Sequence, residues 1–176
     1  MSRTQLKDRV RKVRLLVLDV DGVLTDRRIL LGSDGNMVKA FDVRDGFGLI
    51  LARQAGLRTA IITAEKSTAV SLRAKQLKVE WIAQGALNKR EAFRRCLSRF
   101  RLSPVAVGFI GDDLLDLPIL TQVGFSATVP DAPAEVKRHV HYVTTAHGGR
   151  GAVREVVEMI LRAQGHWDGI VDNYLR

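Results

Sequence analysis

The chain has 176 residues, 46% of them hydrophobic, which is long enough for one well-buried domain and short for two. Its 28 lysines and arginines outnumber 19 aspartates and glutamates, giving a formal net charge of +9. Such a charge suits nucleic acid, an anionic membrane or an acidic small molecule. The basic residues concentrate in 3–14 and 89–101, without base-stacking aromatics or a nucleic-acid-binding motif. We therefore expect a solvated basic face and no nucleic-acid partner.

The cysteine content and the apolar runs bear on cellular location. The single cysteine, Cys96, excludes an internal disulfide and indicates a reducing compartment, and we expect it to be a small buried residue. The first dozen residues lack the apolar segment of a targeting sequence, and no run approaches the ~20 apolar residues of a membrane span. We expect a soluble, cytoplasmic protein with no membrane partner.

The first expected strand is the apolar run at residues 14–18, which has no polar face and is typical of a strand buried inside a parallel sheet. Asp19 and Asp21 follow directly, and Gly22 allows the chain to bend there. Asp-x-Asp-Gly is also common turn chemistry. The apolar strand before it and Gly-Val-Leu-Thr after it favour a ligand site at the carboxyl edge of the sheet.

A hairpin is expected next, at about residues 28–41, because two short apolar segments flank the turn residues Gly32-Ser33-Asp34-Gly35-Asn36. A helix should then begin at Asp45, as its N-cap, and end at Gly56. Beyond it, strands and helices alternate. We expect strands at 59–62, 79–82, 105–110, 125–129 and 141–143, and helices at 66–77, 88–100, 113–123, 134–138 and 152–164.

This alternation predicts an α/β fold: one doubly wound parallel sheet with helices on both faces. The chain shows no internal repeat or low-complexity linker, so residues 1–176 form a single expected domain. The hairpin is a small projection of that domain. The tail at 165–176 contains Trp167 and Tyr174 but has no evident core role.

Further polar residues follow the expected strands or begin a helix. Thr63 ends a strand with a hydroxyl, which alone is weak evidence of function. Lys89 lies on the apolar stripe of its helix, near the N-terminus, where the helix dipole does not favour a cation; a buried anionic partner explains it better. Asp112 and Asp113 follow an apolar strand, and they suit either helix capping or a magnesium site.

The segment Asp19-Val20-Asp21-Gly22-Val23-Leu24-Thr25 resembles the first motif of the haloacid dehalogenase (HAD) superfamily of phosphotransferases. The resemblance implies that Asp19 is the nucleophile, that Asp21 is the general acid and base, and that Thr63 and Lys89 bind the phosphoryl group. It also implies Mg²⁺ held by Asp19, the main-chain carbonyl of Asp21 and Asp112, with Asp113 or Asp116 in support.

Other segments resemble the 3-deoxy-D-manno-octulosonate 8-phosphate (KDO 8-phosphate) phosphatase family over about residues 13–165. They are Lys39-Ala40-Phe41-Asp42-Val43-Arg44-Asp45-Gly46, Gln84-Gly85 with Asn88-Lys89, Gly111-Asp112-Asp113-Leu114-Leu115-Asp116, and Gly148-Gly149-Arg150-Gly151-Ala152-Val153-Arg154-Glu155. This resemblance implies a capless, Mg²⁺-dependent homotetramer that uses the hairpin in assembly and releases KDO for lipopolysaccharide synthesis. Arg44 and Arg150 would contact the anionic sugar acid, and the glycine-rich loop would present a helix N-terminus to it.

One position departs from that family, which commonly has Gly-Arg where this chain has Ala64-Glu65. A glutamate there resembles phosphatases of nine-carbon sugar-acid 9-phosphates, which stay open as an alternative. Glu65 and Arg73 would lie near the mouth of the site and select the sugar, although Glu65 also suits the N-terminal end of a helix. A second alternative is a non-catalytic HAD-like oligomerisation module. It would be marked by the loss of Asp19, Asp21, Lys89 or Asp112, and all four are present.

Overall fold

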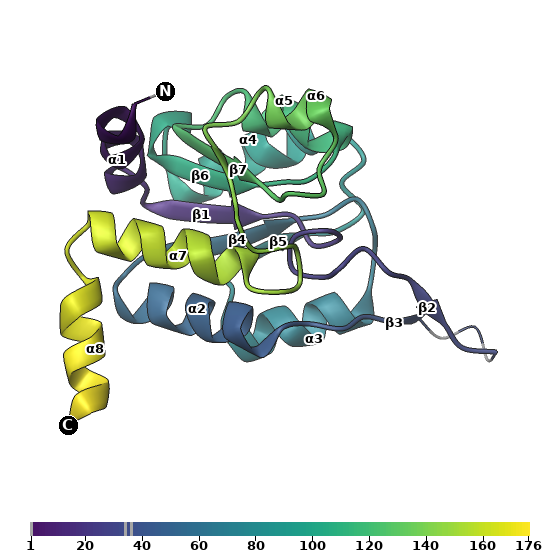
Figure 1. Cartoon of the computed structure of the whole chain (residues 1–176). Coiled ribbons are helices and arrows are strands. Elements are labelled where there is room, and N and C mark those ends of the chain that lie inside the picture. Colours follow the sequence, from purple (N-terminus) through teal and green to yellow (C-terminus); the bar gives the residue numbers. More distant parts are fainter. Residues whose placement is uncertain (1, 34, 36) are drawn as a thin grey trace.

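The fold is built on one sheet of six parallel strands, in the order β5-β4-β1-β6-β7-β8 (Figure 1). The computed structural model describes residues 2–33, 35 and 37–176. Its sheet strands are β1 Leu15–Leu18, β4 Arg58–Ile62, β5 Trp81–Ala83, β6 Val107–Ile110, β7 Phe125–Thr128 and β8 Tyr142–Val143. The predicted parallel α/β sheet is confirmed.

Helices cover both faces of the sheet, as expected. One face carries α2 (Val43–Gln54), α3 (Thr68–Leu77) and α7 (Ala152–Ala163), with α1 (Arg3–Arg11) packed against α7 (Figure 1). The other face carries α4 (Lys89–Phe100), α5 (Leu117–Leu120) and α6 (Ala134–Lys137). Cys96 is fully buried in this second layer, and burial raises the pKa of its thiol to about 12. Its expected role as a small buried residue is therefore confirmed.

The central strand β1 holds the start of the first motif in place. Leu16 and Leu18 pack into the core under α2 and α7, whereas Leu15 and Val17 pack into the core under α4. Strands β4 and β6 flank β1, and Leu18 lies opposite Ile61 and Ile110. The direction in which strands are added reverses at β1, and ligands of open α/β sheets bind at such a reversal.

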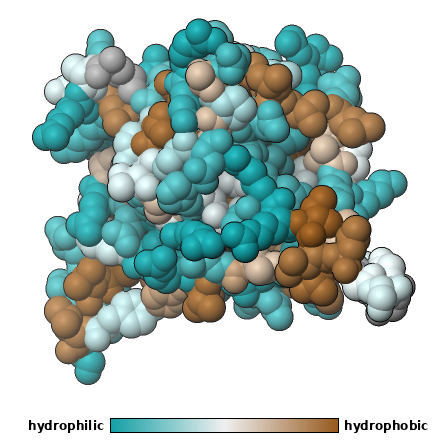
Figure 2. Space-filling model, turned by 45° about the vertical axis from the view of Figure 1, so that its right-hand side comes forward, coloured by the Kyte–Doolittle hydropathy of each residue, from teal (hydrophilic) through white to brown (hydrophobic). Residues whose placement is uncertain are grey.

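The hairpin consists of β2 (Leu30–Leu31) and β3 (Met37–Val38), paired antiparallel. It projects from the body of the molecule (Figure 1). Its strands confirm the predicted hairpin, while the expected turn residues Asp34 and Asn36 lie outside the described residues. The side chains of Leu30, Leu31 and Val38 are exposed. Figure 2 shows hydrophobic surface gathered on the side from which the hairpin projects.

Three local predictions were wrong or incomplete. Helix α2 begins after Asp42, whose carboxylate accepts hydrogen bonds from the N–H groups of Arg44 and Asp45, so the expected N-cap at Asp45 was wrong. Helix α1 was not predicted, although its Val10 is fully buried. The tail also forms a helix, α8 (Trp167–Leu175), and Trp167 packs against the core. Among the described residues, no helix is long and apolar enough to cross a membrane.

Candidate active site

The carboxyl edge of the sheet brings together the polar residues that follow the strands. Asp19 follows β1, Thr63 follows β4, Asp112 lies just beyond β6, and Lys89 is the first residue of α4. All four line one cavity of about 260 Å³. Asp21 and Glu65 also line this cavity. The structure therefore brings six of the nine residues predicted for the site into one place.

A buried network of charges surrounds Lys89. Its ammonium lies 2.9 Å from Asp19 Oδ2 and 2.5 Å from Asp116 Oδ1. Burial lowers the pKa of Lys89, but the charges and hydrogen bonds of the two carboxylates outweigh burial and raise it. Burial, and then the charge of Asp116, raise the pKa of Asp19 to about 8 against the opposing effect of Lys89. The site therefore holds more negative charge than one lysine balances, which favours a further cation.

Asp116 supports the acidic loop after β6. Its Oδ2 accepts hydrogen bonds from the backbone N–H groups of Asp112, at 2.9 Å, and Asp113, at 3.2 Å. Asp113 instead accepts a hydrogen bond from Leu114 N and caps the short 3₁₀ turn Leu114–Asp116. The sequence left open whether Asp113 or Asp116 supports the metal site. In the structure, Asp116 is the residue that contacts both the acidic loop and Lys89.

A divalent cation fits the acidic residues of this edge. Asp19, Asp112 and Asp116 each place a carboxylate oxygen within 4.8 Å of the others, and Mg²⁺ prefers such oxygen ligands. Because Asp116 is engaged by Lys89 and two backbone N–H groups, Asp19 and Asp112 are the better side-chain ligands. Arg27 Nε lies 2.7 Å from Asp112 Oδ2. Burial raises the pKa of Asp112 to about 6, against the opposing effect of Arg27.

Gly22 permits the close turn that follows Asp21. Its φ is 91°, a left-handed conformation that favours glycine, and a Cβ there would meet Asp112 Oδ2 at 2.0 Å. The backbone N–H groups of Val23, Leu24 and Thr25 all donate to the carbonyl of Val20. This turn brings the loop after β1 against the acidic loop after β6.

Lys39 is a buried site residue whose role the sequence did not reveal. Its ammonium lies 2.5 Å from Asp21 Oδ1 and 2.6 Å from Glu65 Oε2. Burial lowers the pKa of Lys39, but the two carboxylates outweigh burial and raise it. The residue follows the exposed strand β3, so its position in the sequence indicates a surface lysine. Only the return of the hairpin towards the sheet places it beneath the two carboxylates.

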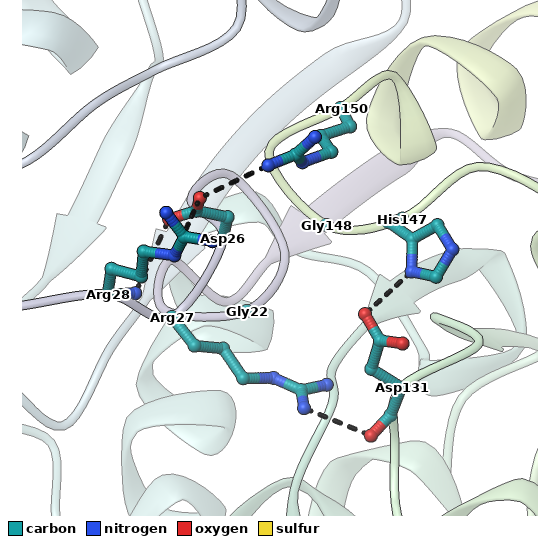
Figure 3. Close-up of a pocket in the computed structure, with 8 residues that line it drawn as sticks. All are labelled: Gly22, Asp26, Arg27, Arg28, Asp131, His147, Gly148 and Arg150. Atoms are coloured by element: carbon teal, nitrogen blue, oxygen red, sulfur yellow. Dashed lines mark hydrogen bonds and ion pairs between the residues drawn. The ribbon is translucent and has the colours of Figure 1, made fainter.

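A second cavity, of about 280 Å³, adjoins the first and is lined by arginines. Figure 3 shows Arg150 directed towards Asp26 and Arg27 directed towards Asp131. Arg27 lines both cavities. Arg44 Nη2 donates to the carbonyl of Arg150 at 3.1 Å. Arg150 lines this second cavity, and Arg44 and Arg150 together line a third cavity of about 470 Å³, so neither of these predicted arginines lies in the first cavity.

The glycine-rich loop packs against the turn after β1. A Cβ at Gly148 would meet the carbonyl oxygen of Gly22 at 1.8 Å, so the loop packs closely on the chain's own first motif. The N-terminus of α7 already has an anionic partner, because Asp45 accepts hydrogen bonds from Gly151 N and Arg154 N. Asp45 therefore already supplies a negative charge at this helix end, and contact of the loop with the sugar acid stays a prediction.

Arg73 is not brought into either of these two cavities. Its Nη2 donates to the carbonyl of Asp42 at 3.3 Å, and its guanidinium lies over the ring of Phe41. It thus links α3 to the start of α2. Its connection to the site runs through the segment that continues from Lys39.

Comparisons with known proteins agree with this geometry. A family model described as haloacid dehalogenase-like hydrolase matches residues 55–156. The 3-deoxy-D-manno-octulosonate 8-phosphate phosphatase KdsC of Salmonella typhi is 42% identical over 94% of this chain and 88% of its own length.

Two solved structures of phosphatases are also similar to this chain. The 3-deoxy-D-manno-octulosonate 8-phosphate phosphatase of Yersinia pestis is 41% identical, with a TM-score of 0.92 over 94% of this chain and 89% of that one. The enzyme of the same name from Moraxella catarrhalis, solved with a magnesium ion, a phosphate ion and KDO, is 36% identical, with a TM-score of 0.96 over 98% of this chain and 99% of that one. The chain therefore belongs to the haloacid dehalogenase-like hydrolases and, within them, to the family of 3-deoxy-D-manno-octulosonate 8-phosphate phosphatases.

Proposed function

We propose that the protein hydrolyses KDO 8-phosphate to KDO and inorganic phosphate, with Asp19 as the nucleophile. The observation that carries the proposal is the placement of Asp19 against buried Lys89, in one cavity with Thr63 and Asp112. The family to which the chain belongs supports the choice of substrate.

The proposed reaction has two steps. Asp19 attacks phosphorus and forms an aspartyl phosphate, while Asp21 protonates the departing sugar oxygen. Asp21 then takes a proton from water, whose oxygen attacks phosphorus and regenerates Asp19. Thr63 donates a hydrogen bond to the phosphoryl group, and Lys89 neutralises its charge in both steps. Burial of Lys89 strengthens this interaction because little water screens it.

We assign magnesium binding to Asp19, Asp112 and the main-chain carbonyl of Asp21. The carboxylate oxygens of Asp19 and Asp112 fit the preference of Mg²⁺ for oxygen ligands. When bound, Mg²⁺ supplies positive charge that favours ionised Asp19 and offsets charge on the phosphoryl oxygens. Asp116 holds Lys89 and the acidic loop in position around it.

The far end of the substrate is assigned to the residues around the second cavity. Arg150 lines this cavity and shares a third cavity with Arg44, and both arginines would contact the sugar-acid carboxylate. Glu65, in the first cavity, would accept hydrogen bonds from sugar hydroxyls. Arg73 would act on this end through the segment at Phe41 and Asp42 that it contacts.

Glu65 is also the observation that favours a second candidate, a phosphatase of nine-carbon sugar-acid 9-phosphates. The non-catalytic module is a weaker alternative, because Asp19, Asp21, Lys89 and Asp112 are all present and all line one cavity. For assembly, we propose a homotetramer built partly on the exposed hairpin. The enzyme would act in the cytoplasm, on the route to lipopolysaccharide.

The test is phosphate release from a panel of sugar phosphates, with Mg²⁺ present. The proposal expects KDO 8-phosphate to give the highest kcat/KM. Preference for a nine-carbon sugar-acid 9-phosphate would support the second candidate instead. No release from any member of the panel, by folded protein, would support the non-catalytic module.

A further inference from the structure

The inference concerns Lys39, which contacts two carboxylates of the site without lining the cavity itself. The side chain of Lys39 is 1% exposed, whereas those of Asp21 and Glu65 are 34% and 33% exposed. The ammonium therefore lies beneath the two carboxylates, on the side away from solvent. Both carboxylates line the cavity above it.

The contacts leave one oxygen of each carboxylate free. Lys39 Nζ and Thr25 Oγ1 both contact Asp21 Oδ1, at 2.5 Å and 3.3 Å. Lys39 contacts only Oε2 of Glu65. In the described part of the chain, neither Asp21 Oδ2 nor Glu65 Oε1 has a hydrogen-bond or ion-pair partner. Each carboxylate is thus held by one oxygen, and the other oxygen is available to a substrate.

Burying an unpaired ammonium group has a high free-energy cost, so the burial of Lys39 depends on its pairing with Asp21 and Glu65. Removing Lys39 would leave the Asp21 side chain held only by the 3.3 Å contact with Thr25 Oγ1, and would leave two carboxylates facing each other without the cation between them. A carboxylate that is held less firmly presents its oxygen to the leaving group for a smaller part of the time.

We propose that Lys39 is a positioning residue, which holds Asp21 so that Asp21 Oδ2 meets the oxygen of the departing sugar, and which fixes Glu65 beside it. This proposal rests on the proposed function of Asp21 as general acid. The residue is supplied by the chain directly after β3, so the hairpin delivers a part of the reaction machinery in addition to its exposed surface.

The role predicts an effect that depends on the leaving group. A sugar alkoxide needs a proton as it departs, whereas p-nitrophenolate is stable as an anion and needs none. The ratio kcat/KM covers the steps up to loss of the leaving group. A residue that positions the general acid should therefore matter for KDO 8-phosphate and matter little for p-nitrophenyl phosphate.

The experiment compares kcat/KM for both substrates in wild type, Lys39→Met and Lys39→Gln. In both variants the ratio of KDO 8-phosphate to p-nitrophenyl phosphate should fall on the order of 10²-fold. Lys66→Met is the matched control, because Lys66 is an exposed lysine next to Glu65 that makes no ion pair with Asp21 in the described chain. It should keep the wild-type ratio. Circular dichroism checks that each variant is folded, and Lys39→Gln retains a polar donor if Lys39→Met does not fold.

A double-mutant cycle tests whether Lys39 acts through Asp21. In the Asp21→Asn background, Lys39→Met should cause little further loss on KDO 8-phosphate, because the general acid is already absent. Additive losses, or an equal fall on both substrates in the single variant, would overturn the proposal and indicate general charge neutralisation. The proposed function is tested separately, by the rates of the wild-type protein alone. If wild type does not hydrolyse KDO 8-phosphate, the kcat/KM ratio to p-nitrophenyl phosphate is measured with the sugar phosphate that wild type hydrolyses best in the panel.

Discussion

At the scale of single residues, burial strengthens the interaction between the charges of Asp19 and Lys89. Asp19 is 6% exposed and Lys89 is 3% exposed, so water screens neither charge effectively. Asp116, fully buried, adds a second negative charge to the same network. The resulting excess of negative charge favours binding of a divalent cation, whose positive charge would favour the ionised form of Asp19 that the proposed nucleophilic role requires.

Glu65 gives a prediction about substrate choice. Its contact with Lys39 assigns Glu65 a place in the cavity rather than a role only at a helix end. Glu65→Gln retains the shape of the side chain but removes its charge, so it should change the preference between eight- and nine-carbon substrates by about tenfold, the value of one charge-assisted hydrogen bond. A competition assay with both substrates measures this preference.

The control for that assay is Glu80→Gln, which removes a glutamate that pairs with Arg58 and does not line the cavity. It should leave the preference unchanged. An equal loss on both substrates in Glu65→Gln would remove Glu65 from the selection of the sugar.

At the level of elements, Asp45 joins the starts of helices α2 and α7. It lies in the first turn of α2, and its two oxygens accept hydrogen bonds from Gly151 N and Arg154 N at the start of α7. It therefore acts as a cap between helices, with its charge at the positive end of α7. The loop that carries Arg150 ends at this cap.

Asp45 predicts a pH dependence of stability. Burial raises its pKa to about 6 in the folded chain, against about 4 in an unfolded one. The folded state therefore holds more protons between these values, and the contribution of Asp45 to the free energy of unfolding falls as the pH rises from about 4 to about 6, on the order of 3 kcal/mol. Urea unfolding of metal-free protein at several pH values should show a smaller fall in Asp45→Asn than in wild type.

The matched control is Asp168→Asn, an exposed aspartate of α8, which should retain the pH dependence of wild type. Identical curves for wild type and Asp45→Asn would show that Asp45 does not titrate in this window. A steeper fall in Asp45→Asn would contradict the sign of the effect.

The elements also show what the sequence could predict. The strands were predictable because their apolar runs end at polar residues, and this pattern alone placed Asp19, Thr63 and Asp112 at one edge. The N-cap of α2 could not be predicted from the sequence, because Asp42 and Asp45 are both acidic residues near the same helix start. Helix α8 depends on packing: Trp167 lies under Arg154 and Arg162, and Tyr174 contacts Phe47 edge to face. The role of Lys39 depends on a contact across the fold that no local pattern contains.

At the scale of the whole molecule, the hairpin is notable because it would expose apolar side chains to water in a monomer. Ile29, Leu30, Leu31 and Val38 are each more than half exposed, at 57%, 52%, 70% and 57%. Apolar surface of this kind on a projecting hairpin favours contact with another copy of the chain. The same segment leads into Lys39, which contacts Asp21 and Glu65, so the proposed assembly and the proposed positioning of Asp21 would use one element.

This surface predicts that Leu31→Lys weakens assembly. Light scattering of wild type at micromolar concentration should give four times the mass of one chain, and Leu31→Lys should give a smaller mass because a charge in an apolar interface is costly. Val105→Lys, at an exposed valine outside the hairpin, should remain tetrameric. A monomer mass for wild type would contradict the proposed tetramer.

The most direct test of the central claim is the rate of phosphate release by Asp19→Asn, with Mg²⁺ and saturating KDO 8-phosphate. The amide cannot attack phosphorus, so the folded variant should release no phosphate, while Asp168→Asn, the same change on exposed α8, should release it at the wild-type rate. A folded Asp19→Asn protein that retains more than a few per cent of wild-type activity would contradict the assignment of Asp19 as the nucleophile.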